Sequence, residues 1–571
     1  MSSINGPTDQ TRTDDEEFET DGPAQETHDK LKHIGHRFNY NSNFVLQTDS
    51  NNFDLVIIGA GINGAGIARD AALRGLKVLL LDKDDVASGT SSYSTRLIHG
   101  GLRYLEHGEF GLVRESLRER ESLLKIAPHL VQPLPILIPI YSGMTRGRAK
   151  IRAGMIAYDF LSRGKSLPRH GVLSVMETLR RIPSLNDNGL VGSVIYYDAQ
   201  VEFAERLVVE NVLSAVEHGA TVITHARVDD LITAETRVVA ARYQIQSGAT
   251  HTVNASFFVN AAGPWIDRVL GRTNSSTNER LLGGTKGSHI VVAPFAGAGS
   301  VAVYVEAQTD RRPFFIIPWN GNYLIGTTDI RFEADPDEAR AETWEIDYLL
   351  KETNRLFPNA NLGRSNILYT YSGVRPLPIT TDHNEDQITR KHFVKQHRSL
   401  TNLVSIVGGK LTTYRSLAEE CVDLVCQKLE LDCAECKTSE LALPGARDFQ
   451  LFAEEFDKSS ELSAGAKSRL LRIYGSRARY VIDFCRNEGL LEYLDEQQTI
   501  LKGEIAFAFE KEFAETLTDC LMRRTMIGLN ADMGLNEVQA AADLARQFRN
   551  WDDERASLEL EQYRSFVEMR R

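Results

Sequence analysis

The first strong hydrophobic pattern in the chain predicts a strand, a turn, a helix and a second strand. Residues 54–58 (Asp-Leu-Val-Ile-Ile) form an apolar run of the length of a buried strand. A glycine-rich turn and an alanine-rich helical segment follow, and a second apolar run covers residues 77–82. Together these segments predict a βαβ unit, in which two parallel strands flank one helix.

Further strand patterns recur far apart along the chain. Residues 198–228 repeat a helix followed by a strand, and the apolar runs 257–260 and 403–407 each lead into a glycine turn. Residues 314–319 and 323–326 show a β-like alternation instead. Strands that end in glycine turns but are separated by other sheet patterns indicate one nucleotide-binding domain. It is built from several segments and interrupted by a second, sheet-based domain.

The two ends of the chain differ in composition from its centre. Residues 1–50 are rich in polar and acidic side chains with few aliphatics, so we expect a disordered acidic extension. Residues 441–571 are charged and rich in Leu, Ala, Glu and Arg, which predicts an all-helical C-terminal domain. Between them, within 51–440, we expect the nucleotide-binding domain at about 51–130, 195–285 and 365–440, and the second domain at about 131–194 and 286–364.

A glycine motif marks the turn between the first strand and its helix. Gly59, Gly61 and Gly64 form a G-x-G-x-x-G pattern. The first glycine permits the tight turn, the second lets the backbone approach a pyrophosphate, and the third lets the helix and strand pack closely. Asp82 ends the second strand, about 20 residues further on, where an acid binds a ribose hydroxyl and favours FAD or NAD over NADP. The pattern therefore predicts a dinucleotide site.

Three other segments favour FAD over NAD. Residues 88–92 supply small and hydroxyl side chains, and the segments 260–265 and 408–413 would frame the same ligand from other sides. FAD is long and needs such an extended cradle. A helix that opens at Thr412 would place its positive end near the pyrimidine ring of the flavin and stabilise the anionic reduced form. Each segment alone is typical of an ordinary turn, so the prediction of FAD rests on their joint occurrence.

Composition and charge narrow the class of protein. The chain has 571 residues, which suggests three or so domains at roughly 150 residues each. Its net charge of −13 argues against broad nucleic-acid binding, but not against a local group of cations that holds a small anion. No apolar run reaches about 18 residues and the N-terminus has no apolar signal region, so we expect neither a membrane-spanning helix nor secretion.

The cysteines lie in the last third of the chain. All six follow residue 420, which is unlike the disulfide framework of a secreted protein and favours a reducing compartment. The alternative of an iron–sulfur site is open for Cys421, Cys426, Cys433 and Cys436, but their spacing matches no standard cluster pattern. We therefore expect buried or incidental thiols and no metal site.

Several longer motifs are spread over the chain. They are residues 97–107 (Leu-Ile-His-Gly-Gly-Leu-Arg-Tyr-Leu-Glu-His), 287–289, 317–319, 326–329, 371–377, 408–415 and 521–525 (Leu-Met-Arg-Arg-Thr). In sequence and order they resemble the FAD-dependent glycerol-3-phosphate dehydrogenases of the aerobic, respiratory type. The resemblance implies an α/β fold in which an FAD-binding Rossmann-like domain, similar to that of p-hydroxybenzoate hydroxylase, is interleaved with a mixed β-sheet substrate domain.

The resemblance also implies an activity. Members of this family oxidise sn-glycerol 3-phosphate to dihydroxyacetone phosphate by hydride transfer to FAD, and pass the electrons to a quinone in the membrane. We therefore expect a cytoplasmic protein that is peripherally associated with the inner face of the cytoplasmic membrane. A homodimer is a further expectation.

The expected chemistry needs cations for the substrate phosphate and an acceptor for the hydroxyl proton. The candidate cations are Arg103, Arg375, Arg390 and Lys410, because arginine suits bidentate phosphate contact. His289 follows a Lys-Gly-Ser turn and precedes an apolar strand, and a histidine can accept a proton near neutral pH. A hydrogen-bonded structural histidine is the alternative. We expect His289 and Arg375 to be catalytic and Tyr104 to bind a substrate oxygen.

The residues predicted to contact FAD come from the glycine turns and the strand ends. They are Gly59, Gly61, Asn63, Gly64, Asp82, Thr90, Ser91, Ser92, His99, Gly100, Gly101, Val228, Ala261, Gly263, Gly408, Gly409, Lys410, Leu411 and Thr412. Of these, His99 is either a flavin-side or a structural group.

A basic segment beside apolar residues points to the membrane. Arg146, Arg148, Lys150 and Arg152 lead into the apolar and aromatic residues 155–161. Such a segment can lie on an anionic membrane surface, and a solvated helix face is the alternative. Three other functions stay open: a glycerol-3-phosphate oxidase that uses oxygen, a non-catalytic flavoprotein and, more distantly, an amine or amino-acid oxidase of the same superfamily.

Overall fold

Two β-sheets and a group of C-terminal helices make up the described part of the chain. The computed structural model describes residues 52–106, 108–144, 147–162, 164–273, 280–379 and 391–571. The predicted acidic extension, Arg390 and Arg146 lie outside these residues. Among the described residues, no helix is both long enough and apolar enough to cross a membrane.

The first sheet contains the predicted βαβ unit. Strand β1 (Asn52–Ile58) pairs in parallel with β2 (Val78–Leu81) on one side and β10 (Thr250–Asn260) on the other. The strand order is β17–β18–β10–β1–β2–β7, with β8 and β9 extending from β10. The remaining bounds are β7 (Thr221–Ile223), β8 (Ala226–Ala234), β9 (Arg237–Ile245), β17 (Phe393–Gln396) and β18 (Leu403–Val407).

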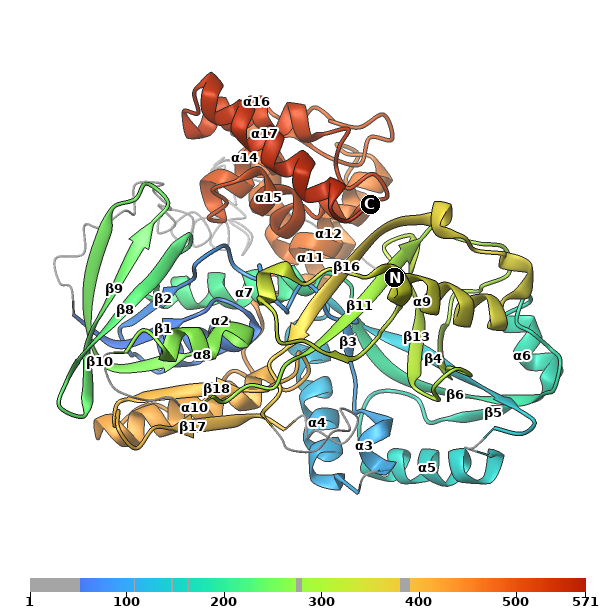
Figure 1. Cartoon of the computed structure of the whole chain (residues 1–571). Coiled ribbons are helices and arrows are strands. Elements are labelled where there is room, and N and C mark those ends of the chain that lie inside the picture. The colour runs from blue at the N-terminus through green and yellow to red at the C-terminus, as the bar shows by residue number, and fades with distance from the viewer. Residues whose placement is uncertain (1–51, 107, 145–146, 163, 274–279, 380–390) are drawn as a thin grey trace, which may run out of the picture. The chain divides into compact units, whose positions relative to one another are not determined.

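Three helices cover one face of this sheet. Helix α2 (Ile62–Leu73) packs against α7 (Ala204–Glu217) and α10 (Tyr414–Leu429) (Figure 1). Their apolar residues share one core with the inner faces of β1 and β2. Strands β1, β2, β10 and β18 are parallel, so their carboxyl ends and the glycine turns that follow lie at the same edge of the sheet. Segments that are far apart in sequence therefore meet at this edge.

The second sheet is mixed. Its strands are β3 (Leu97–Ile98), β4 (Val131–Tyr141), β5 (Gly171–Leu173), β6 (Leu190–Val201), β11 (Thr285–Val292), β12 (Ala302–Glu306), β13 (Pro313–Trp319), β14 (Asn322–Gly326), β15 (Ile330–Arg331) and β16 (Ile367–Arg375). The pair β4–β12 is parallel, and the other described pairings of this sheet are antiparallel. Strands β6 and β16 belong to this sheet, although the boundaries expected near 195 and 365 divide β6 and place β16 in the nucleotide-binding domain.

Further helices lie outside the C-terminal group. Their bounds are α3 (Leu102–Glu106), α4 (Phe110–Ile126), α5 (Arg148–Leu161), α6 (Val175–Arg181), α8 (Ile266–Leu270) and α9 (Thr343–Leu356). Helix α5 contacts both α3 and α4. These three helices therefore form one cluster, which adjoins the motif at residues 97–107.

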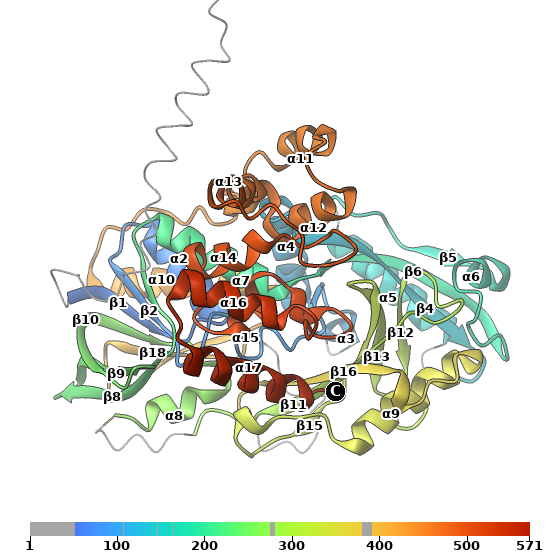
Figure 2. The same ribbon diagram turned by 90° about the horizontal axis from the view of Figure 1, so that it is seen from above.

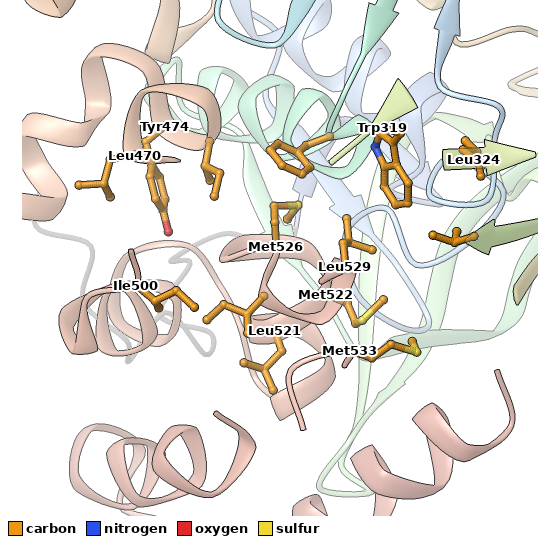
Figure 3. Close-up of a cluster of buried hydrophobic side chains, with 14 of the residues drawn as sticks. Trp319, Leu324, Leu470, Tyr474, Ile500, Leu521, Met522, Met526, Leu529 and Met533 are labelled. Carbon is orange, nitrogen blue, oxygen red and sulfur yellow. The ribbon is translucent and has the colours of Figure 1, made fainter. Parts of the chain in front are cut away.

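The C-terminal residues are helical, as predicted. The elements are α11 (Phe449–Lys458), α12 (Ala464–Tyr474), α13 (Ala478–Glu488), α14 (Lys502–Lys511), α15 (Leu517–Asp519), the π-helical turn η8 (Cys520–Arg524), α16 (Val538–Arg549) and α17 (Asp553–Glu568) (Figure 1, Figure 2). Figure 3 shows how this group packs against the second sheet: Met522, Met526 and Leu529 lie in one buried cluster with Trp319. The Tyr369 hydroxyl of β16 also donates a hydrogen bond of 2.8 Å to the Leu529 carbonyl.

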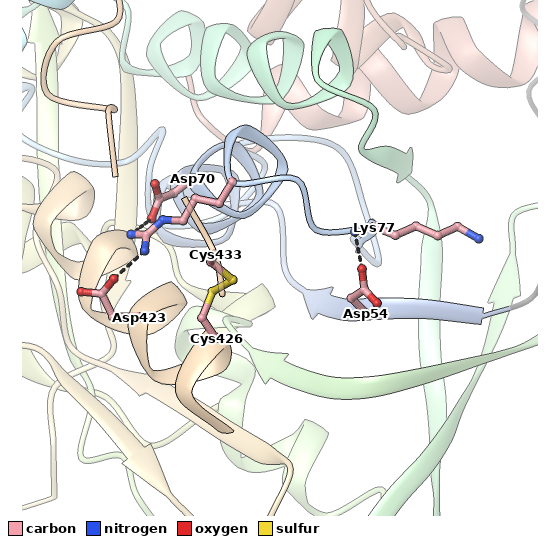
Figure 4. The surroundings of a disulfide bond; sticks show 7 residues. Asp54, Asp70, Lys77, Asp423, Cys426 and Cys433 are labelled. Atoms are coloured by element: carbon pink, nitrogen blue, oxygen red, sulfur yellow. Dashed lines mark hydrogen bonds and ion pairs between the residues drawn. A yellow bond between two sulfur atoms is a disulfide. The ribbon is translucent and has the colours of Figure 1, made fainter. Parts of the chain in front are cut away.

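The prediction of incidental thiols is wrong for one pair of cysteines. Cys426 and Cys433 form a disulfide, with their Cα atoms 6.1 Å apart (Figure 4). Helix α10 ends just after Cys426, where Glu430 takes a left-handed conformation and turns the chain back towards the helix. Spacing alone did not reveal this reversal. The bond takes two of the four thiols away from the iron–sulfur alternative.

Candidate active site

A cavity of about 870 Å³ lies where the glycine turns of the first sheet meet the second sheet. Most of the predicted site residues line it: Gly59, Gly61, Asn63, Asp82, Thr90, Ser91, His99, Gly101, Tyr104, Val228, Ala261, Gly263, His289, Arg375, Gly408, Gly409, Lys410, Leu411 and Thr412. The fold therefore brings together segments that are more than 300 residues apart. A cavity of this size and extended lining fits a dinucleotide and a small second ligand.

Two glycines of the motif after β1 leave no room for a side chain. Gly59 has a φ of 109°, and a Cβ placed there would lie 2.6 Å from the carbonyl oxygen of Ala261. A Cβ at Gly64 would lie 1.8 Å from the Gly59 carbonyl oxygen. These two glycines thus allow the close approach of turn, helix and β10, as the motif predicts. Gly64 supports the turn from within and is not itself part of the cavity wall.

Asp82 is the first residue of the loop that follows β2. Its carboxylate accepts hydrogen bonds from the Ala60 N–H at 2.5 Å and the Asp84 N–H at 2.9 Å. Burial raises the pKa of Asp82 to about 6, although both bonds favour the charged form. The acid is therefore held beside the glycine turn and faces the cavity, as binding to a ribose hydroxyl requires.

The turn at residues 408–412 joins the two sheets at the cavity. The Asn63 side chain donates to the Gly408 carbonyl at 3.4 Å, and the Gly408 N–H donates to the Pro376 carbonyl at 2.9 Å. The Asn63 Oδ1 atom is buried and has no hydrogen-bond partner among the described residues. A buried acceptor that faces a cavity fits a site for a ligand with hydrogen-bond donors, and the flavin ring system carries such donors.

Several predicted contacts are not placed on the cavity wall. Ser92 is buried and donates to the Ala87 carbonyl at 2.6 Å. The Gly100 N–H donates to the Tyr158 hydroxyl at 3.0 Å, beneath the wall. Arg103 lies in α3, but its side chain is outside the described part of the structure, as is the whole of Arg390. Ser92 and Gly100 thus shape the site from behind.

His289 is the predicted proton acceptor, and it lies in the second sheet on β11. Its Nε2 is 3.0 Å from the Thr95 hydroxyl, and its ring lies 4.9 Å from that of Tyr371, measured between centroids. The Nδ1 atom has no hydrogen-bond partner among the described residues. Burial lowers the pKa of His289 well below its ordinary value, and the charges of Arg375 and Arg96 lower it further. The ring is therefore neutral at physiological pH and able to accept a proton.

Arg375 ends the neighbouring strand β16. Its Nη1 lies 2.9 Å from the Asp329 carboxylate, and its Nη2 donates to the Thr327 hydroxyl at 3.2 Å. A second guanidinium, that of Arg312, donates to the Asp329 carbonyl at 2.6 Å and lies 3.6 Å from its carboxylate. Both arginines line the cavity. Asp329 thus holds two guanidinium groups at the wall beside His289.

The wall continues with Lys410 and a set of aromatic rings. The Lys410 ammonium lies 3.8 Å from the centroid of the Tyr104 ring, which holds a cation over an aromatic face. The Phe315 ring lies 4.9 Å from the Tyr304 ring and 6.5 Å from the His99 ring, measured between centroids. Rings and cations together give a site that can bind an anion.

Sequence reasoning missed part of this arrangement. Arg312 was not singled out because it follows another arginine in a polar turn, and nothing local distinguishes the two. Asp329 and Thr95 were also missed. Asp329 stood inside one of the quoted motifs, so its position carried a signal, whereas Thr95 is recognised only by its contact with His289.

Comparison with known proteins agrees with this geometry. The family model described as FAD dependent oxidoreductase matches residues 54–424, and that of the C-terminal domain of alpha-glycerophosphate oxidase matches residues 436–556. A glycerol-3-phosphate dehydrogenase of Synechocystis sp. is 45% identical over 532 residues, covering 90% of this chain and 96% of the relative. A D-erythritol 1-phosphate dehydrogenase of Brucella abortus is 37% identical over 509 residues, covering 88% and 97%.

A solved structure extends the likeness to the whole fold. The glycerol-3-phosphate dehydrogenase of Bacillus halodurans, complexed with FAD, superposes with a TM-score of 0.73 at 28% identity, covering 95% of this chain and 97% of that one. The glycine turn, the buried acid and the long cavity of this chain fit that cofactor. The chain therefore belongs to the FAD-dependent oxidoreductases, in the family of the glycerol-3-phosphate dehydrogenases, and its cofactor is FAD.

Proposed function

We propose that this protein oxidises sn-glycerol 3-phosphate at C2 to dihydroxyacetone phosphate. The observation that carries the proposal is the group of cations beside His289 within the cofactor cavity. Arg312, Arg375 and Lys410 all line it. A small phosphorylated alcohol offers the matching anion and the hydroxyl group next to it.

The phosphate is the group that these cations bind. Around His289 the described lining residues include the three cations and the Asp329 carboxylate, while the nearby Arg96 is paired with Glu205 through two bonds of 2.7 Å. A phosphate dianion would be attracted to this group of cations. The planar guanidinium of Arg375 can bind two phosphate oxygens at once, which fixes the orientation of the alcohol as well as its position.

His289 takes the proton of the C2 hydroxyl. With Nε2 bonded to Thr95, Nδ1 is the ring atom left to accept it. Burial is the main reason that the pKa of His289 is low, and the positive charge of Arg375 lowers it further before substrate binds. A phosphate dianion at Arg375 offsets that charge, so substrate binding itself strengthens the base.

The residues around the base supply orientation and exclude water. FAD, held at the glycine turns, would supply the hydride acceptor for C2. Thr95 holds the imidazole on one side and the Tyr371 ring packs beside it, so the ring does not need to reorient before it accepts the proton. Fixed charges and a fixed base provide the larger part of the expected rate acceleration.

The test is anaerobic mixing of the holoenzyme with substrate. We expect glycerol 3-phosphate to bleach the flavin absorbance, and unphosphorylated glycerol at the same concentration to leave it unchanged. An erythritol phosphate is the informative competitor, because one relative is named for that substrate class. Bleaching by the erythritol phosphate alone would reassign the substrate, and bleaching by neither would support a non-catalytic flavoprotein.

A quinone is the proposed electron acceptor. The support is the family resemblance together with the exposed apolar side chains of helix α5. A glycerol-3-phosphate oxidase shares the same first half-reaction, and so only the second half-reaction separates the two. We expect turnover with a short-chain quinone and little peroxide. Release of one peroxide per substrate in air would assign the oxidase instead.

Helix α5 is the proposed contact with the membrane. Its Ile156 and Phe160 side chains are 56% and 69% exposed, and Arg152 lies one turn before Ile156 on the same face. Phe110, at the start of α4, is also exposed. Exposed apolar side chains beside a cation fit a helix that lies in the interface of an anionic bilayer. The same helix contacts α3, whose Leu102 lines the cavity, so a quinone in the membrane would be near the cofactor.

Vesicle binding tests this contact. We expect the holoenzyme to sediment with anionic phospholipid vesicles at low salt, and an Ile156→Ser/Phe160→Ser variant to bind about tenfold more weakly, since two apolar side chains are lost. Leu558→Ser, at an exposed position on α17, is the control. Equal binding of all three proteins would mean that the membrane contact lies elsewhere on the protein. No binding of the native protein would contradict the proposed membrane contact. The inner-face location and the homodimer stay predictions.

A further inference from the structure

We propose that the C-terminal domain holds the loop at residues 82–85 through Arg523 and Arg524, and that this support sets how tightly FAD is retained. The loop carries Asp82 at the glycine turn, and Asp82, Lys83 and Asp84 line the cavity. The inference rests on the FAD site and not on the proposed substrate. It assigns a role to the Leu-Met-Arg-Arg-Thr motif, which the proposed chemistry does not use.

Asp85 is the residue of the loop that the C-terminal domain binds. This carboxylate is fully buried, and both of its oxygens are bound from the C-terminal domain. Arg524 binds it with two nitrogens, at 2.7 and 2.8 Å, and Arg523 adds a third bond of 2.6 Å. A buried carboxylate bound by two guanidiniums is a rigid contact, since moving it would leave charges without partners in the protein interior.

A second connection runs through His225. Its backbone N–H donates to the Asp84 carbonyl at 2.6 Å, and the next N–H, of Ala226, donates to the Asp82 carbonyl at 2.7 Å. Its imidazole Nε2 lies 2.9 Å from the Asp519 carboxylate of α15. Asp519 in turn accepts a bond of 2.6 Å from Arg523. The loop is thus held on its main chain and on its side chain by one connected network.

The other end of the network is anchored in the C-terminal domain. Arg523 and Arg524 belong to the π-helical turn η8, a form of helix that is rare and concentrated at functional sites. The Arg524 Nε also donates to the Glu512 carbonyl at 2.5 Å. Neighbouring residues of the same turn, Leu521 and Met522, are buried in the hydrophobic cluster of Figure 3. The arginines therefore have little freedom to follow a displaced loop.

Support of this kind acts on ligand retention. A loop that is already in its binding geometry does not have to be ordered when the ligand binds, so less affinity is lost to ordering. Loss of one guanidinium would let Asp85 move and would shift Asp82 away from the glycine turn. Arg523 and Arg524 are therefore positioning residues, because they act on the cofactor through the loop.

The experiment measures FAD release from the holoenzyme in the absence of substrate. In the Arg523→Gln variant we expect the dissociation constant for FAD to rise at least about tenfold, a loss of about 1.4 kcal/mol. The readout is the appearance of free flavin fluorescence after dilution. The KM for glycerol 3-phosphate, measured at saturating FAD, should change less than twofold, because the substrate cations lie outside this network.

Arg477→Gln is the matched control. Arg477 is also buried in the C-terminal domain and pairs with Glu512 at 2.6 Å and with Glu210 at 3.2 Å; among the described residues, neither of these carboxylates is bonded to residues 82–85. We expect this variant to retain FAD like the native protein even if its melting temperature falls. Equal FAD release from both variants would mean that the effect is general destabilisation, and would overturn the proposal. A folded Arg523→Gln protein that retains FAD as tightly as the native protein would also overturn it.

His225→Gln provides the second route if Arg523→Gln does not fold. His225 lies at the edge of the network and is partly accessible, so its replacement disturbs packing less. We expect a rise of about threefold in the dissociation constant for FAD, since one charge-assisted hydrogen bond weakens. Unchanged retention in this variant would also overturn the proposal.

Discussion

The two ends of the cavity use the same residue types for opposite purposes. At the loop of residues 82–85, Asp85 is paired with Arg523 and Arg524, and Asp519 with Arg523 and His225. At His289, by contrast, Arg312 and Arg375 both pair with Asp329, Arg312 also lies 3.7 Å from Asp310, and Lys410 lines the same cavity. Arg523 and Arg524 thus join two segments of the fold, whereas Arg312 and Arg375 lie on the cavity wall, where we propose that they bind the phosphate.

The largest expected effect is at the substrate end. Replacing Arg375 by Gln should lower kcat/KM for glycerol 3-phosphate by about 10³-fold, because a buried charged contact to the phosphate is lost. FAD content should stay native, since the cation does not belong to the supporting network. Steady-state kinetics with the flavin spectrum as a check measure both. Arg364→Gln, which breaks the exposed pair with Asp347, is the control. A native KM in the Arg375 variant would remove this residue from phosphate binding.

The base should have the next largest effect. His289→Gln is expected to reduce kcat by about 10²-fold, the lower range for loss of a general base, with a smaller change in KM. The variant keeps a polar group near Thr95, which limits damage to the surrounding packing. The rate of flavin bleaching under anaerobic conditions isolates this step from reoxidation. Near-normal kcat would leave His289 with the structural role that was the alternative.

The disulfide belongs to neither end and should affect stability alone. Replacing Cys426 and Cys433 by serine should lower the free energy of unfolding by about 2 kcal/mol, because the unfolded chain regains the freedom of the closed loop. A denaturant titration measures the change, and kcat/KM should stay within twofold. A reducing agent should shift the native protein in the same direction and leave the serine variant where it is. If the reducing agent shifts neither, the bond is not formed in solution.

The smallest expected effect is a pH dependence at the supporting end. Burial opposes the charged form of His225, but the hydrogen bond and charge of Asp519 outweigh it, with smaller contributions from Asp85 and Glu515, and raise its pKa to about 9. Because the pKa is raised on folding, the stabilisation is complete below the ordinary value of about 6.5 and is lost as the pH rises through about 9. Arg523 faces the same carboxylate and keeps its charge throughout this range.

The rate of FAD release measures the effect of the titration of His225. We expect the rate of release to increase by a few-fold between pH 7 and about 9.5, in keeping with the weakening of one charged hydrogen bond. The His225→Gln variant should show a flatter profile over the same interval, starting from faster release. A native profile that does not change with pH would contradict the role of the His225 imidazole in supporting the loop.

The cofactor end was largely predictable because its signals are local. A strand, a glycine turn and a helix must follow one another closely, so Gly59, Gly61 and Asp82 could be recognised from spacing and then found in the cavity. Individual contacts were less certain. Ser92 has the right chemistry, but its hydroxyl is bonded to the backbone nearby. Side-chain direction within a turn depends on neighbours that spacing does not reveal.

The network of the C-terminal domain had no comparable signal. Arg523 and Arg524 stood in a recognised motif, yet nothing in the sequence pairs them with Asp85, which is more than 400 residues away. The same holds for Arg312 at the substrate end. Ion pairs between distant segments follow from the docking of whole elements, and a charged residue in a polar turn looks the same whether it is solvated or paired.

The sequence by itself predicted the βαβ unit and the two glycine turns, because these depend on periodicity and on residues that are close along the chain. The class of fold and the FAD cofactor were predicted from motifs spread over the whole chain and from the family resemblance that they carry. The tertiary structure alone decided which cations surround His289, which strands form the second sheet and how the C-terminal arginines reach Asp85. The physical reason is that burial and pairing of charge are properties of contacts between segments, and such contacts exist only once the hydrophobic faces of those segments have packed together.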